Sequence, residues 1–297
     1  MCVLCEQEAL LRLRVGASIH GDEALATGNS LSIDVLVDEQ SAAFSKQLTA
    51  TDQLMTLYLH TAGGAVQVSG GGFGEQTIQS KEIPSEDQSY FEALIGRLEQ
   101  FVDLDFAFVQ SPDAADIAIY YDTEIVLDED SETLGLATTG IRGWELFLNY
   151  PQVSDDVNYR RYVLAHELGH SLGLEHPFAS SDGDVFAGIT DPWASAYPED
   201  TVMAYRNPLS GQWPNFFTEN DLNALVEVWG AEALRFGDGG HVFAGNNYSE
   251  IVEGGRGDDL FEGGGGDDTL IGLRGFDVLR GDEGDDVLRS GNGRDSL

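Results

Sequence analysis

The last part of the sequence repeats with a strict period of nine residues, and this feature limits the possible folds of the chain more than any other. Five rows begin at Gly254, Gly263, Gly272, Gly281 and Ser290. Glycine stands fourth in every row. The sixth residues are Asp259, Asp268, Asp277, Asp286 and Asp295, and the eighth residues are Phe261, Leu270, Leu279, Leu288 and Leu297. Two degenerate rows precede them, with His241 and Glu250 at the sixth position. A flexible linker is the alternative interpretation, but a linker requires no phase, so the period predicts a repeated structural unit.

A second motif is the segment 166–176, which reads HELGHSLGLEH. Helical residues four apart differ in direction by only about 40°, so His166 and His170 can bind one ion. His176 cannot join them on the same helix, because it would lie about 15 Å along the axis from His166. The chain must therefore turn back. Gly173 permits the left-handed conformation that ends a helix, and Pro177 prevents the helix from resuming.

Three neutral imidazoles with an open fourth position are typical of a catalytic zinc site. Zinc lowers the pKa of a bound water toward about 7, and Glu167 can take the proton and pass it to a leaving amine. The motif therefore predicts hydrolysis of peptide bonds. A chance match on an amphipathic helix is the alternative, but the full spacing to His176 is much more specific than H-E-x-x-H alone.

Composition excludes several classes of partner. Acidic residues outnumber basic ones 52 to 15, a balance that repels nucleic acid and anionic membranes and suits divalent cations. No run of about 18 apolar residues occurs, so we expect no membrane insertion. Met1 to Glu8 lacks the basic start of a secretory signal peptide. The two cysteines, Cys2 and Cys5, can form no disulfide that ties the folded body together, and we interpret this C-x-x-C pair as incidental.

The region between residues 46 and 235 reads as one mixed domain. Strands are predicted at 54–60, 105–109, 116–121, 135–139 and 144–149, an irregular glycine-rich connection at 63–72, and a turn at 128–132. Helices are predicted to start near Ser85, near 154–156 and at Thr218, the last one ending at Gly230. The strand at 144–149 is a candidate edge strand for pairing with an extended substrate.

Two further segments carry weaker signals. Leu31 to Val37 is a possible strand, but residues 1–45 hold no recognisable chemistry and form an N-terminal extension or a pro-segment. In the loop 180–198, Asp182 and Asp184 are interpreted as turn residues, with calcium binding as the alternative.

These residues resemble a known family. The eleven-residue motif is followed, 27 residues after His176, by Met203-Ala204-Tyr205, a pattern similar to the metzincin clan and, within it, to serralysin-type metalloproteases. The resemblance implies that Met203 lies beneath the metal and that Tyr205 lies near the zinc, as an auxiliary ligand or a stabiliser of the transition state.

The repeats resemble the calcium-binding RTX nonapeptide. That resemblance implies tight turns at the glycines, calcium bound by the five aspartates and by backbone carbonyls, and apolar residues filling a parallel β-roll. The expected fold is α/β (α+β): a metzincin-type protease domain at 46–235, with a twisted mixed sheet and an active-site helix, followed by a β-roll at 236–297.

The expected function is that of a secreted, extracellular zinc endopeptidase, a monomer that acts on proteins or peptides and is exported without a signal peptide. No cap or export signal is evident before Leu297. The rival hypothesis is a calcium-dependent binding or surface module without activity. Glu167 argues against the rival, since a structural zinc site needs no general base.

Overall fold

The structure, a computed structural model, describes residues 29–49, 53–70, 74–123, 133–140 and 142–297. It divides into two compact units. The sheet unit comprises Gly28–Glu99 and Leu104–Gly230, and the roll unit comprises Ala231–Leu297 with Gln100–Asp103. Cys2, Cys5 and the predicted turn at 128–132 lie outside the described residues. Within the described ranges, no helix combines the length and apolar character needed to cross a membrane.

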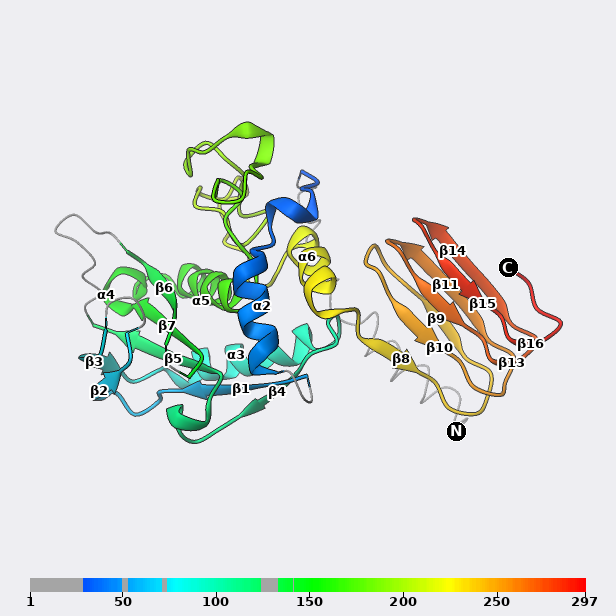
Figure 1. Cartoon of the computed structure of the whole chain (residues 1–297), viewed down its shortest axis with the longest axis horizontal. Helices are drawn as coiled ribbons and strands as arrows, with labels where there is room; N and C mark the ends of the chain where they lie inside the picture. Colours follow the sequence, from blue (N-terminus) through cyan, green and yellow to red (C-terminus); the bar gives the residue numbers. More distant parts are fainter. Residues whose placement is uncertain (1–28, 50–52, 71–73, 124–132, 141) are drawn as a thin grey trace. The chain divides into compact units, whose positions relative to one another are not determined.

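A seven-stranded mixed sheet forms the centre of the sheet unit (Figure 1). Its strands are β1 (Leu54–Leu59), β2 (Gly64–Val68), β3 (Gln76–Lys81), β4 (Asp105–Phe108), β5 (Ile117–Asp122), β6 (Gly135–Thr139) and β7 (Trp144–Asn149). β1 runs parallel to β4 and β5, and β5 runs parallel to β7. β3 is antiparallel to β2 and β5, and β6 is antiparallel to β7. The mixed α/β class and the mixed sheet are confirmed.

Both faces of the sheet are covered near β5. Side chains alternate between the faces of a strand, and Tyr120 and Tyr121 are both 1% exposed. Tyr121 faces helix α3 (Ser85–Leu98), where its hydroxyl donates to Asp87, while Tyr120 packs with Val68 and Ile78 of the β2–β3 hairpin. The predicted irregular connection at 63–72 is therefore wrong in part. Gly63 and Gly64 at the start of β2 and Gly70 after it have positive φ, and β2 pairs with β3 in a hairpin where an irregular connection was expected. Gly71 and Gly72 lie outside the described residues.

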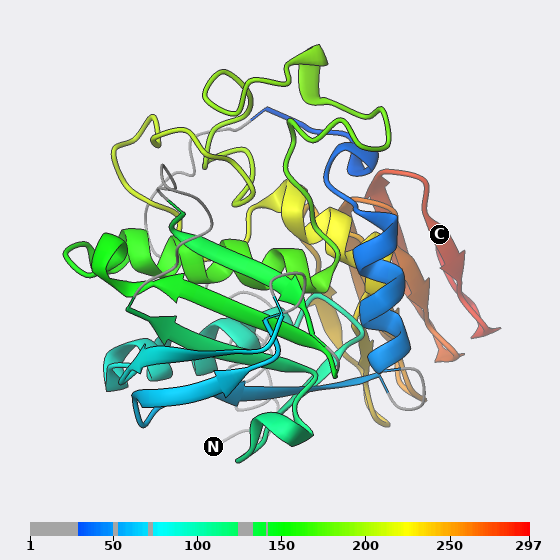
Figure 2. The ribbon, with the colours of Figure 1, turned by 60° about the vertical axis from the view of Figure 1, so that its left-hand side comes forward.

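Helix α5 (Val157–Leu172) packs on β6 and β7, and Figure 2 shows it (green) lying across the strands. Helix α2 (Glu39–Leu48, blue) meets its C-terminal end. There the Ser45 hydroxyl donates to the Ser171 carbonyl at 2.7 Å, and the Trp144 indole donates to Ser45 at 2.8 Å. The remaining helices are α4 (Tyr150–Val153), α6 (Glu219–Trp229) and the 3-10 turns η2 (Ile33–Val35), η4 (Pro112–Ala114) and η5 (Phe186–Gly188).

The strand predicted at 31–37 is wrong. The segment forms η2 and then a single antiparallel bridge between Val37 and Leu174. The backbone N–H of Glu175 also donates to the Leu36 carbonyl at 2.9 Å, so these residues bind the chain just after α5. The predicted boundary between an N-terminal extension and the protease domain, near residue 46, falls within α2.

The predicted edge strand is also wrong. β7 pairs with β5 on one side and with β6 on the other, so its backbone is fully occupied. Among the described strands, β6 pairs with β7 alone. In the described part of the sheet, the edge beside α5 is therefore formed by β6.

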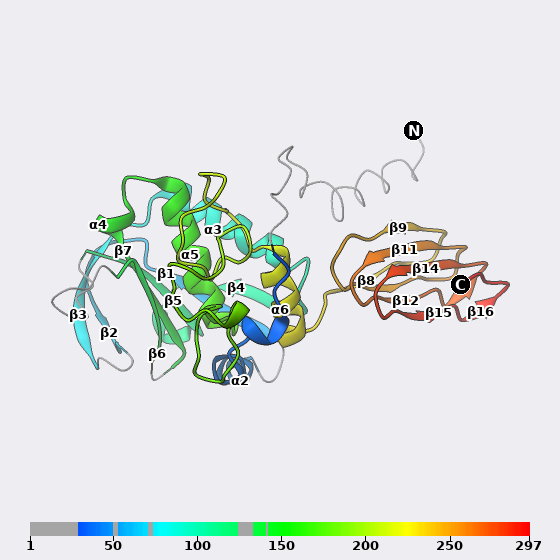
Figure 3. The same ribbon diagram turned by 90° about the horizontal axis from the view of Figure 1, so that it is seen from above.

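The roll unit is a coil of parallel strands in which partners are 18 residues apart. Two nine-residue rows make one full turn of the coil, and Figure 3 shows the two main sheets lying one over the other. One sheet has the order β15-β12-β10-β8, the second β14-β11-β9, and a third holds β13 and β16. The strands are β8 (Ala233–Arg235), β9 (Val242–Ala244), β10 (Ile251–Glu253), β11 (Leu260–Gly265), β12 (Thr269–Ile271), β13 (Arg274–Gly275), β14 (Val278–Glu283), β15 (Val287–Arg289) and β16 (Asn292–Gly293).

Residues at the eighth position fill the interior of the coil in all rows but the last, where Leu297 is 68% exposed, and Leu288 packs against them partly buried. Phe243, Val252, Phe261, Leu270 and Leu279 form one buried cluster, and each is at most 1% exposed. The two degenerate rows contribute Phe243 and Val252 to it. The expected stack of parallel strands is confirmed, and the coil includes both degenerate rows.

A buried ion pair fastens α5 to α3. Arg160, 2% exposed, donates through Nε to Asp87 Oδ2 at 2.6 Å and through Nη2 to Asp87 Oδ1 at 3.2 Å. Asp87 is 1% exposed and also accepts from the Tyr121 hydroxyl. The pair joins two helices and a strand, so removing one partner leaves a charge buried without compensation.

We predict that Asp87→Ala lowers the free energy of unfolding of the sheet unit by about 3–5 kcal/mol. Glu86→Ala is the matched control. Glu86 lies 3.4 Å from Arg160, but its side chain is 59% exposed, so the loss should stay below about 1 kcal/mol. Urea denaturation followed by tryptophan fluorescence measures this, because all four tryptophans lie in the sheet unit. Equal losses of unfolding free energy in the two variants would contradict the assignment of Asp87 as the buried partner that stabilises Arg160.

Candidate metal centres

Helix α5 carries two of the three histidines, and the turn that follows it carries the third. Asp156 caps the helix, since its carboxylate accepts from the backbone of Asn158 and Tyr159 at 2.9 and 3.1 Å. The helix ends at Gly173, which has φ 104° and ψ 11°, the left-handed conformation that the sequence predicts. A Cβ at Gly173 would also lie 2.8 Å from the Cβ of Ala42 in α2. Both the backbone conformation and the approach of α2 therefore require glycine here.

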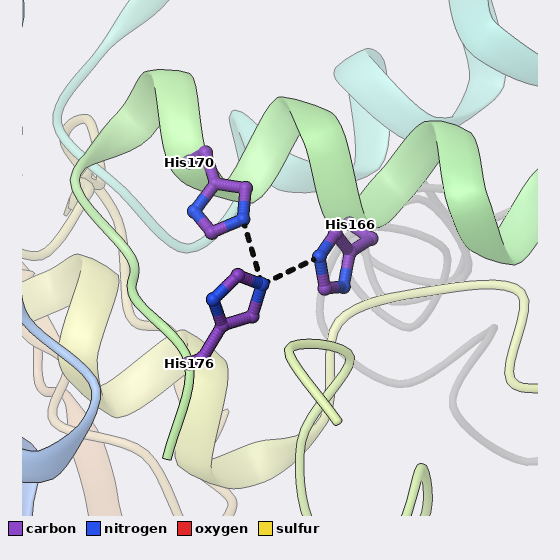
Figure 4. Close-up of side chains that lie close together, drawn as sticks. All are labelled: His166, His170 and His176. Atoms are coloured by element: carbon purple, nitrogen blue, oxygen red, sulfur yellow. Dashed lines mark hydrogen bonds between the residues drawn. The ribbon is translucent and has the colours of Figure 1, made fainter. Parts of the chain in front are cut away.

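The turn brings His176 back to His166 and His170 (Figure 4). The Nε2 atom of His176 lies 3.1 Å from Nε2 of His166 and 3.1 Å from Nε2 of His170. All three possible ligand atoms lie within 4.8 Å of one another. Within the described part of the chain, no other group of three or more His, Cys, Asp and Glu residues is this compact.

Hydrogen bonds fix the orientation of two of the rings. Nδ1 of His166 lies 2.8 Å from the Val202 carbonyl, and Nδ1 of His170 lies 3.0 Å from the Leu174 carbonyl. A carbonyl can only accept, so each Nδ1 carries the proton and each Nε2 presents a lone pair. His176 can donate to only one of them. Three converging nitrogens with too few protons between them fit a metal cation, and this donor set suits zinc.

Burial keeps the three imidazoles neutral. It lowers the pKa of His166 to about 3 and the pKa of His170 to about 4, and it holds the pKa of His176 well below its ordinary value. Neutral imidazole is the form that binds a metal, so no proton must be removed at neutral pH.

Glu167 lies between α5 and β6 and is 5% exposed. Burial raises the pKa of Glu167 to about 8, and a hydrogen bond with the backbone of Ala137 in β6 opposes this rise. A Cβ at Gly135, also in β6, would fall on the Glu167 carboxylate. Glycine at this position of β6 thus leaves room for the carboxylate.

Tyr205 and Met203 also lie at this centre. The Tyr205 ring centroid is 4.8 Å from that of His176 and 5.7 Å from that of His166. Burial, and then the charge of Glu167, raise the pKa of Tyr205 to about 12, although 41% of the residue is exposed. Met203 is fully buried against α5: a Cβ at Gly169 would lie 2.8 Å from its sulfur. The structure therefore brings Glu167, Tyr205, Met203 and the histidines together.

The repeats form a second kind of centre. Oδ1 of Asp277 accepts from the backbone N–H of Asp259 at 3.0 Å, and Oδ1 of Asp286 accepts from Asp268 at 2.9 Å. The other carboxylate oxygens of Asp259, Asp268 and Asp277 are buried and have no hydrogen-bond partner among the described residues. Buried carboxylate oxygens without donors fit a hard cation such as calcium. Asp295, in the last row, accepts from Asp277 at 3.3 Å.

Comparison with known proteins agrees with a metal centre at the three histidines and with calcium binding in the repeats. The model of the RTX calcium-binding nonapeptide repeat matches residues 244–279 and 262–297. A serralysin of Photorhabdus sp. (strain Az29) is 29% identical over 136 residues, which are 42% of this chain and 24% of the relative. Serralysins A and C of Dickeya chrysanthemi are each 33% identical over 31% of this chain, covering 20% and 21% of their own lengths.

The chain is a serralysin-like protein with RTX repeats. This confirms the resemblance that was drawn from the zinc motif, from Met203-Ala204-Tyr205 (the methionine turn) and from the nine-residue period. The serralysin-like chain spans about a quarter or less of the length of these relatives.

Asp221 is predicted from the sequence only as the capping partner of Thr218, and the structure adds a second role, because it also holds the segment that leads into Met203. Asp221 is fully buried in the first turn of α6, where it completes a capping box with Thr218. Its carboxylate also accepts from the Thr201 hydroxyl at 2.5 Å and from the Val202 N–H at 2.9 Å. Because the Val202 carbonyl accepts from His166, the cap of α6 positions a histidine of α5. The sequence indicates the capping box of Thr218 and Asp221, but it does not indicate that Asp221 also accepts from Thr201 and Val202.

We predict that Asp277→Asn raises the calcium concentration needed to fold the roll unit by at least about tenfold, the lower end of what loss of a supporting ligand costs. Circular dichroism of the full chain during a calcium titration measures this. Asp282→Asn removes the same charge from an exposed residue at φ 69°, which asparagine also adopts, and should leave the midpoint unchanged. An unchanged midpoint in Asp277→Asn would remove this residue from the calcium site.

Proposed function

We propose that this chain is a zinc-dependent endopeptidase whose roll unit is stabilised by calcium. The observation that carries the proposal is the convergence of three neutral histidine nitrogens beside a buried glutamate. His166, His170 and His176 hold the zinc, and Gly173 and Met203 support them from the turn and from beneath the helix. Asp259, Asp268, Asp277, Asp286 and Asp295 bind calcium with backbone carbonyls.

Zinc held by the three histidines would supply a Lewis acid and would lower the pKa of a bound water toward about 7. Glu167 would accept a proton from the attacking water and would return it to the departing amine. Its buried position suits both roles, since the raised pKa of Glu167 keeps the proton-bearing and proton-free forms close in free energy. Tyr205 donates a hydrogen bond from its hydroxyl to the carbonyl oxygen of the scissile bond. The high pKa of Tyr205 keeps that hydroxyl protonated.

The substrate is an extended stretch of protein or peptide that adds to the free edge of β6 by strand pairing. This edge lies beside Glu167, because Gly135 and Ala137 of β6 both approach its side chain. Proteins with such repeats and such relatives act outside the cell, and we propose the same location for this chain.

We predict that Glu167→Gln retains zinc but cleaves casein about 10²–10⁴ times more slowly, because the amide cannot accept the proton. Zinc content and the rate of cleavage are measured on the same sample. A chelator should abolish the parent's activity and added zinc should restore it. Full activity in Glu167→Gln would exclude this mechanism, and an inactive parent that binds both metals would favour a binding module.

We further predict that Gly135→Ala keeps zinc but loses about 10²-fold in kcat, since the added methyl displaces the Glu167 carboxylate. Gly96→Ala in α3 is the matched control, because a Cβ there meets no atom within 4 Å. The control should retain full activity. If Gly135→Ala is as active as the control, the contact between β6 and Glu167 has no catalytic consequence.

A further inference from the structure

An exposed tryptophan lies near the histidine triad. All four tryptophans are among the described residues, and Trp193 stands out, because it is 67% exposed. Trp144 and Trp229 are only 6% and 7% exposed. An indole ring has a large apolar area, so leaving it in water forgoes the free energy of burial. A single exposed apolar side chain is ordinary, whereas a contiguous exposed surface marks a place of contact.

Trp193 belongs to a row of aromatic rings that begins at the triad. The rings of His176 and Phe178 stack at 4.8 Å with an interplanar angle of 8°. The Tyr205 ring contacts both, at centroid distances of 4.8 Å and 4.9 Å, and the Trp193 ring lies 6.1 Å from Tyr205. We call Phe178, Tyr205 and Trp193 the ring surface. Tyr205 is 41% exposed and Phe178 is half-buried, so each member is accessible.

Hydrogen bonds hold the loop that carries Trp193. The Trp193 N–H donates to the Asp191 carboxylate at 3.0 Å, and the Ser195 N–H donates to the Asp191 carbonyl at 3.1 Å. Arg206 follows Tyr205 in the sequence, and its guanidinium donates to the Ser195 carbonyl at 3.0 Å. The loop is thus fastened to the segment that carries Tyr205. A surface that is ordered before binding loses little entropy when a ligand adds to it.

The ring surface is suited to an aromatic side chain. Aromatic rings attract one another in edge-to-face or offset arrangements at centroid distances of about 4.5–7 Å, which is the spacing within this row. A further ring from a ligand would continue the same pattern. The charged groups beside the surface are already engaged with the backbone, Asp191 with the Trp193 N–H and Arg206 with the Ser195 carbonyl. A cation could also lie on an indole face, so the experiment compares the two.

We propose that the ring surface binds an aromatic side chain of the substrate next to the scissile bond, with Trp193 as the residue that determines this preference. The inference rests on the proposed function, in which the Tyr205 hydroxyl donates to the carbonyl oxygen of that bond. A side chain beside this carbonyl lies close to the Tyr205 ring, and the Trp193 ring adjoins Tyr205. Peptides with an aromatic residue at the cleavage site are therefore cleaved in preference to those with alanine.

The first test measures binding without cleavage. Full-length Glu167→Gln, loaded with zinc and calcium, is titrated in a calorimeter with short alanine peptides that are blocked at both ends. One peptide carries a single phenylalanine, a second carries a single arginine, and a third contains alanine alone. We expect the phenylalanine peptide to bind about tenfold more tightly than the alanine peptide, because its ring is buried and gains aromatic contacts.

Variants in the same background assign the preference to Trp193. Trp193→Ala should bring the two affinities close to each other, whereas Trp193→Phe, which keeps a ring, should retain most of the difference. Leu209→Ala is the matched control, because Leu209 is also 67% exposed but lies outside the ring surface, and it should retain the full difference. Equal binding of the phenylalanine and alanine peptides, a difference that survives Trp193→Ala, or tighter binding of the arginine peptide would each overturn the proposal.

The second test maps cleavage sites. The parent and Trp193→Ala digest casein briefly, and mass spectrometry locates the bonds that are cut. Aromatic residues should adjoin the cut bonds several times more often with the parent than with Trp193→Ala. The same frequency with both overturns the proposal. A parent that cuts no bond contradicts the proposed function instead, and the preference for the phenylalanine peptide in the calorimeter then decides whether the ring surface binds aromatic side chains.

Discussion

The left-handed turn at Gly173 is the constraint on which the candidate site depends. A straight continuation of α5 would carry His176 away from His166 and His170, and only a reversal within a few residues returns it. Glycine adopts this conformation without steric cost, and it also allows α2 to come close. The bridge between Val37 and Leu174 then holds the reversed chain. Residues far apart in the sequence thus secure a turn of a few residues.

Buried carboxylates support the site from several directions, and each has a different partner. Asp87 pairs with an arginine and Asp221 with backbone and hydroxyl donors, whereas Glu167 is largely without donors. A carboxylate satisfied by donors stabilises a fixed geometry, while one kept short of donors can accept and release a proton. Asp87 and Asp221 therefore stabilise the structure, and Glu167 is suited to the proton transfer that we propose for it.

The sequence predicted the features that depend on local patterns. Helix α5, its cap near Asp156, its end at Gly173 and the strands β6 and β7 follow from spacing and capping residues, and the nine-residue period predicted the buried column of the roll. The sequence could not predict which strand forms the sheet edge, since this depends on the long-range partners of β6 and β7, which a local pattern does not specify. Helix α2 was missed because its only large apolar residues are Phe44 and Leu48. Gly135, and the contacts of Asp221 with Thr201 and Val202, act between distant segments, so no local pattern identifies these roles.

The 18-residue register of the roll has a consequence for the order of folding. Each of its strands pairs with a segment one coil away, whereas the sheet unit must join residues as distant as Asn29 and Asp200, 171 positions apart. Closing short loops costs little chain entropy and is fast, while joining remote segments is slow. Once calcium neutralises its stacked aspartates, the roll should therefore reach its final structure early. The sheet unit, with its dispersed contacts, should set the overall rate at which the chain becomes native.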